Sequence, residues 1–220
     1  MRTRSRLVAL TLFGIAMGYM EGAVVAYLRH LYYDPPSRLF PLASFDPHLY
    51  MIELGREVAT LVMLGAVAYL SSRRNNFLRR LLFFLFAFGV WDITYYIWLR
   101  WMIGWPVHWT DWDILFLIPL PWFAPFLAPV LVSIMFIVFS SLVLLRNKDP
   151  KPAPGSYAMG VSGAFIMFLS FIWEPLRILA QEGKDGFLTY MPGNFPWPVF
   201  LLGYAGMLVG FLLLVRHKSH

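Results

Sequence analysis

Five acidic residues fall inside long apolar stretches of this chain, where a charged side chain is costly and usually marks a function. They are Glu21, Glu53, Glu57, Asp92 and Glu174. Carboxyl groups in apolar surroundings can act as general acids or bases, bind a metal ion, or form ion pairs that fix the register of helices. If the protein is an enzyme, we expect Glu21, Glu57 and Asp92 to be its catalytic residues.

Other polar residues recur near these acids at helical spacing. Residues three and four apart lie on one face of a helix, so Glu53, Arg56 and Glu57 share a face, as do Glu174 and Arg177. Tyr95 and Tyr96 follow Asp92 by three and four residues. We expect the following residues to bind or orient a ligand: Glu53, Arg56, Tyr95, Tyr96, Glu174 and Arg177.

The acids outnumber the cations of the same layer, which holds only Arg56 and Arg177. A buried carboxylate without a partner takes up a proton, finds a cation or contacts water. A network of ion pairs that only fixes helix register is the other interpretation, although such a network would be expected to balance its charges.

Three histidines, His30, His48 and His108, lie near the same ends of the apolar stretches as the acids. Carboxylate and imidazole ligands suit iron, manganese, zinc or copper, so these histidines are candidate ligands of a transition metal. Their spacing matches neither Glu-x-x-His nor His-Glu-x-x-His. A haem between the helices is not expected because no histidine lies deep in a stretch, and the chain has no cysteine for thiolate ligation.

The composition is that of a membrane protein. Of the 220 residues, 59% are hydrophobic and 14% charged, with a mean hydropathy of +0.63; soluble domains carry roughly 25% charged residues. Stretches long enough to cross a bilayer lie at about 7–29, 49–70, 78–103, 121–146, 157–180 and 197–215. We therefore predict an all-α, polytopic integral membrane bundle of about six transmembrane helices, forming a single domain over residues 1–220. We expect the first stretch to be a retained span and not a signal peptide, because its apolar pattern continues past residue 21.

The basic residues predict the orientation. Most of the 18 lysines and arginines lie before residue 7, at 73–80, at 146–151 and in the C-terminal tail. Cytoplasmic ends of membrane helices are rich in these residues. We expect a multi-pass protein of the cell membrane with both termini cytoplasmic and the five acids in the extracytoplasmic half. This bias accounts for the net charge of +6 without a nucleic-acid partner.

The start of the fourth stretch is rich in proline. Its prolines are Pro119, Pro121, Pro125 and Pro129. Upstream, Thr110 and Asp113 have the spacing of an N-cap and an acid three residues later. We expect a short interfacial helix at about 110–118, then a proline-broken segment that lines the acidic cavity, then the span. In the alternative, Pro121 and Pro125 occupy the first turns of an ordinary helix.

Glycines recur four residues apart on two stretches, where they would allow close approach of another helix. They are Gly14, Gly18 and Gly22 on the first stretch and Gly206 and Gly210 on the last. Internal packing is one interpretation, and a homodimer or a partner subunit is the other.

The function that fits these features is an enzyme or binding protein for a lipid-like ligand (a lipid, isoprenoid or quinone) reached from the extracytoplasmic side. A non-catalytic subunit of a larger membrane complex is the alternative. A proton- or ion-coupled transporter fits less well, since it needs polar groups across the whole membrane. A cavity of a few hundred Å³ lined by the acids would favour ligand binding, whereas fully paired acids without a cavity would favour the subunit.

Overall fold

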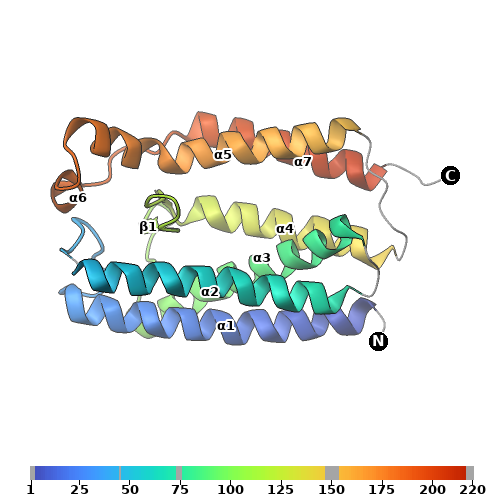
Figure 1. Ribbon diagram of the computed structural model, residues 1–220, viewed down its shortest axis with the longest axis horizontal. Helices are drawn as coiled ribbons and strands as arrows, with labels where there is room; N and C mark the ends of the chain where they lie inside the picture. Colours follow the sequence, from blue (N-terminus) through green and yellow to red (C-terminus); the bar gives the residue numbers. More distant parts are fainter. Residues whose placement is uncertain (1–2, 45, 73–75, 147–153, 217–220) are drawn as a thin grey trace.

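The computed structural model describes residues 3–44, 46–72, 76–146 and 154–216 as a bundle of long helices (Figure 1). The helices are α1 (Thr3–Tyr32), α2 (Pro47–Ser71), α3 (Phe77–Ile103), α4 (Leu127–Leu145), α5 (Pro154–Gln181), the short α6 (Gly186–Thr189) and α7 (Trp197–Arg216). Within the described residues, α1, α3, α4, α5 and α7 are long and apolar enough to cross a membrane. The predicted all-α, polytopic membrane bundle is confirmed.

Helix α2 forms where the second of the six spans was predicted but is not among the five long apolar helices. Its 25 residues are enough to cross a bilayer. Glu53, Arg56 and Glu57 all lie in its first half.

The long helices run side by side along the longest axis of the molecule (Figure 1). Helix α1 packs against α3, α3 against α4, and α5 against α7, while α2 rests mainly on α3. Helix α1 begins and α7 ends at one end of the bundle, and α6 and the strands lie at the other. This second end carries the site described below.

The glycines spaced four residues apart on α1 and α7, here called the glycine stripes, pack against other helices of the same chain. A Cβ atom added to Gly14 would lie 2.8 Å from Val90 Cγ1 on α3, so only glycine allows α1 and α3 to approach this closely. On α7, a Cβ atom added to Gly210 would lie 2.7 Å from the amide nitrogen of Gly160 on α5. Internal packing therefore occupies both stripes, and association with a second copy or another subunit stays a prediction.

The predicted interfacial helix at 110–118 is wrong. Residues Trp112–Ile114 form strand β1, which pairs antiparallel with β2 (Phe123–Pro125). Thr110 therefore caps no helix. The carboxylate of the next residue, Asp111, accepts hydrogen bonds from the backbone nitrogens of Val107 at 2.6 Å and His108 at 3.0 Å. These bonds stabilise a turn just before β1, where the chain enters the hairpin.

The fourth long helix begins at Leu127, six residues later than predicted. Pro119, Pro121 and Pro125 all precede it, so they do not occupy the first turns of an ordinary helix. Pro129 lies in the first turn of α4, where a missing backbone N–H removes no hydrogen bond of the helix. The expected proline-broken segment before this span is therefore present, as a hairpin.

Candidate functional site

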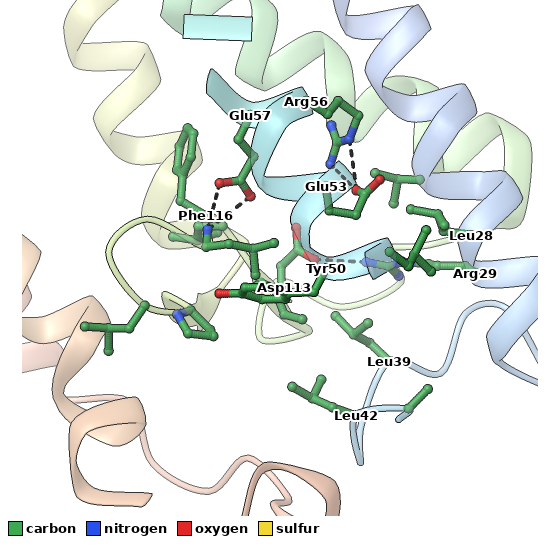
Figure 2. A pocket seen from close by; sticks show the side chains of 18 of the residues that line it. Leu28, Arg29, Leu39, Leu42, Tyr50, Glu53, Arg56, Glu57, Asp113 and Phe116 are labelled. Carbon is green, nitrogen blue, oxygen red and sulfur yellow. Dashed lines mark hydrogen bonds and ion pairs between the residues drawn. The ribbon is translucent and has the colours of Figure 1, made fainter. Parts of the chain in front are cut away.

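A cavity of about 650 Å³ lies between the end of α1, the start of α2, the middle of α3, the β1–β2 hairpin and the α5–α6 segment. Its size is in the range of small-ligand pockets. Figure 2 shows Glu53, Arg56 and Glu57 on one side of this cavity and Leu39 and Leu42 on the other. The acids of α2 and Arg56 thus gather on one side of the cavity, with apolar side chains such as Phe116 among them, and leucines lie opposite.

Most of the predicted site residues meet here. The lining includes Glu21, Glu53, Arg56, Glu57, Asp92, Tyr95 and Tyr96. They come from three helices, so the tertiary fold joins groups that the sequence could only place at similar depth.

Arg56 is the centre of an ionic network. Its Nη2 lies 2.8 Å from Glu53 Oε2, and its Nη1 forms an ion pair with the carboxylate of Glu21. The hydroxyl of Thr60 donates a second bond to Glu21, at 3.2 Å. One guanidinium thus holds two carboxylates and joins α1 to α2.

Glu57 has a different environment. Its side chain is largely buried, and both of its carboxylate oxygens accept from the backbone nitrogen of Leu117, at 3.0 and 2.9 Å. Leu117 lies in the segment that joins β1 to β2. Glu57 therefore attaches α2 to the hairpin, and it forms no ion pair with any residue in the described part of the chain.

Asp92 joins α3 to α4. Its Oδ2 accepts a hydrogen bond of 2.7 Å from the hydroxyl of Ser133. Gly89, one turn earlier, permits this bond, because a Cβ atom there would lie 2.7 Å from the carbonyl oxygen of Ser133. Within the residues that the structure describes, Asp92 has no ion pair either.

Sequence reasoning missed a buried ion pair in the same lining. Arg29 Nη2 on α1 lies 2.9 Å from Asp113 Oδ1 on β1, and each side chain is only 3% exposed. The guanidinium carbon of Arg29 also lies 3.9 Å from the ring centroid of Trp105, a cation–π contact. Burial raises the pKa of the Asp113 carboxyl, while the Arg29 guanidinium opposes that rise.

Tyr96 supports this pair. Its ring is buried and packs against Trp105 and Phe126, with centroids 6.1 and 5.5 Å away. Its side chain lies close to the Asp113 carboxyl. The apolar run from Ile114 that follows Asp113 was the one sequence signal that this acid would be buried.

Glu174 and Arg177 do not join the cavity. They pair with each other on α5, at 3.0 Å, and the Arg177 side chain is 51% exposed. Neither residue lines the cavity. The structure thus separates the fifth acid and the second predicted arginine from the other candidates.

The predicted metal ligands are not gathered into a site. The Nδ1 atom of His30 bonds to the Ala26 carbonyl oxygen, at 2.8 Å on its own helix. His48 is exposed at the start of α2, and the His108 side chain is 76% exposed in the loop after α3. The described residues contain no group of three or more His, Asp or Glu that could hold a metal ion.

No protein-family model, curated protein or solved structure matches this chain. The case for a function therefore rests on the geometry and chemistry of the cavity.

Proposed function

We propose that this protein binds a lipid-like ligand (a lipid, an isoprenoid or a quinone) in the cavity between α1, α2, α3 and the hairpin. The observation that carries this proposal is that one largely apolar cavity of about 650 Å³ gathers charged side chains on one side, opposite Leu39 and Leu42. Ligand pockets are typically apolar with a few polar groups that fix orientation. An amphiphile would place its polar group near Arg56 and Glu57 and its hydrocarbon part against Leu39 and Leu42.

The basic residues support access from the extracytoplasmic side. In the sequence, 12 of the 18 lysines and arginines lie before residue 7, at 73–80, at 146–151 or after residue 215, and the other six lie in segments toward the cavity. Among the 12, the described part of the chain holds Arg4 and Arg6 at the start of α1, Arg79 and Arg80 at the start of α3, and Arg146 just after α4. These are at the end of the bundle opposite the cavity (Figure 1). Since cytoplasmic ends are enriched in Lys and Arg, the cavity would lie in the extracytoplasmic half.

The acids without an ion pair suggest how the ligand would be held. Glu57 and Asp92 each accept hydrogen bonds only from neutral donors among the described residues. A hydroxyl or amine of the ligand would donate to Glu57, whose α2 helix forms one wall of the cavity. If the protein also transforms its ligand, these two carboxyls, which form no ion pair with a cation of the described chain, are the first candidates to accept or donate a proton.

The alternative of a non-catalytic subunit receives less support. An acidic layer that served only to fix helix register would need no adjoining cavity, and here Glu21, Glu53, Glu57 and Asp92 all line one. A cavity lined by the acids was the feature expected to distinguish the two functions, and its presence favours ligand binding.

Mass spectrometry of retained lipids tests the proposal. Protein washed extensively in detergent should keep about one lipid-like molecule per chain, since a cavity ligand exchanges more slowly than the lipids on the protein surface. Leu42→Trp, which fills the apolar side of the cavity, should abolish retention. The control is Val62→Trp, because Val62 lies outside the lining and is 63% exposed on α2. Equal retention in all three proteins, or none in the wild type, would contradict the proposal.

A further inference from the structure

The rim of the cavity is marked by residues that both line it and are exposed. On α2 these are Tyr50, 37% exposed, and Met51, 61% exposed. On the facing α5–α6 segment they are Leu179, 44% exposed, and Leu188, 42% exposed. No lining residue of α1 or α3 is exposed: Arg29 and Asp92 are buried, and the others, such as Glu21, are buried or half-buried. The remaining exposed lining residues, Pro47, Pro119 and Lys184, belong to α2, the hairpin loop and the α5–α6 segment. The mouth therefore lies between the first turn of α2 and the α5–α6 segment.

The packing of α2 explains why the cavity opens there. Helix α2 rests on α3, and α5 packs against α7, but α2 makes no comparable packing contact with α5, α6 or α7 in the described chain. The buried residues of α2 are Glu57, Thr60, Leu64 and Ala68, so nothing before Glu57 is fully buried in this helix. The first ten residues of α2 thus form a wall of the cavity instead of a packed interface.

The chemistry of the rim is that of a surface in contact with hydrocarbon. Large exposed apolar side chains grouped around one opening mark contact with a membrane or a ligand. The apolar surface continues away from the mouth along both helices, through Ile52 and Val58 on α2 and Trp173 and Leu176 on α5. Lys184 is the basic residue of the rim, and a lysine at a membrane interface can extend its ammonium group to water.

We infer that the ligand enters sideways from the bilayer, through this mouth between α2 and the α5–α6 segment. The inference rests on the proposed function and narrows its ligand to a molecule that resides in the membrane through a hydrocarbon chain. The hydrocarbon chain of the ligand passes between Met51 and Leu188 while its polar group moves toward Arg56 and Glu57. A water-soluble amphiphile entering past residues 33–44 is the competing route.

Because the chain has no cysteine, single-cysteine variants give an unambiguous test of the mouth. Nitroxide labels are attached to Met51→Cys and Leu188→Cys in phosphatidylcholine vesicles. Oxygen, which concentrates in the bilayer, should enhance the spin relaxation of these labels more than a water-soluble nickel complex does. Val62→Cys on the exposed face of α2 is the control for contact with lipid, and Glu182→Cys, in the exposed turn after α5, is the control for contact with water. Labels at the mouth that match Glu182→Cys would overturn the inference, because the mouth would then face water.

A second experiment measures passage through the mouth. Protein with its retained molecule is mixed with excess phosphatidylcholine vesicles, and the loss of that molecule is followed by mass spectrometry. A bulky maleimide on Leu188→Cys should slow the loss about tenfold or more relative to a methylthio group at the same site. An unchanged rate, with the molecule present, overturns lateral entry and leaves ligand binding intact. If the wild type holds no such molecule, the proposed function fails instead, and the label accessibilities alone decide where the mouth opens.

Discussion

Arg29 on α1 and Asp113 on β1 form a buried ion pair of 2.9 Å although 84 residues separate them in the sequence. The pair fastens the hairpin to the end of α1, and the hairpin in turn supplies Leu117, to which Glu57 is bonded. The position of one cavity wall thus depends on a contact between two residues that were not among the acids first identified. This relationship makes the pair a strong test of the site's architecture.

Asp113→Ala should destabilise the protein severely. Removing one partner of a buried pair leaves the Arg29 guanidinium uncompensated, at a cost of about 3–5 kcal/mol. Thermal unfolding in detergent would report this as a large fall in Tm. The matched control is Glu174→Ala, whose partner Arg177 is 51% exposed, and an exposed pair contributes only about 0–1 kcal/mol. Equal shifts for the two variants would mean that the Arg29–Asp113 pair is not buried in the folded protein.

Arg56→Met should destabilise the bundle because it leaves the carboxylates of Glu21 and Glu53 without their shared cation. Adding Glu21→Gln to this variant should recover part of the loss, since one of the unpaired charges is then gone. Residues in one ionic network show coupling energies of about 0.5–3 kcal/mol. A double-mutant cycle from unfolding measurements checks this. Strict additivity of the two substitutions would show that Arg56 and Glu21 do not interact.

The apolar stretches predicted the helices well because membrane-spanning helices need a fixed length of apolar residues, which can be read locally. Helical spacing likewise put Glu53, Arg56 and Glu57 on one face, and that face does line the cavity. Which elements pack against each helix face could not be predicted in the same way. Glu174 has the same predicted depth as the other acids, but its place outside the cavity depends on how α5 packs against α7.

The hairpin was missed for a related reason. Thr110 and Asp113 match the spacing of a helix start, but the carboxylate of Asp113 is used by Arg29, a residue far away in the sequence. Local signals also could not separate a proline-broken helix from a strand pair, because proline at 119 and 121 interrupts helical hydrogen bonding without specifying what replaces it. Long-range ion pairs and strand register are properties of the packed chain.

Gly18→Ala should weaken the contact between α1 and α3. The added Cβ atom would lie 3.0 Å from the carbonyl oxygen of Trp91 and would overlap Thr94, and overpacking of this kind costs about 1–3 kcal/mol. The control is Gly65→Ala on α2, where nothing lies within 4 Å of an added Cβ atom. There the change should stabilise, because alanine favours a helix over glycine by up to about 1 kcal/mol. Opposite signs of the two Tm shifts are expected, and a neutral Gly18→Ala would refute close packing at this stripe.

Two serines on α4 allow the bond to Asp92 to be isolated. Ser133 and Ser140 are both fully buried, but the hydroxyl of Ser133 donates to Asp92, whereas that of Ser140 has no partner among the described residues. Ser133→Ala should cost about 1–3 kcal/mol, because a buried carboxyl group loses its side-chain donor. Ser140→Ala removes an unsatisfied hydroxyl and should be neutral or stabilising. Since Asp92 also lines the cavity, Ser133→Ala should lower retention of the bound molecule as well as Tm, and Ser140→Ala should leave retention unchanged. Loss of stability without any loss of retention would mean that Asp92 holds α3 to α4 and takes no part in binding.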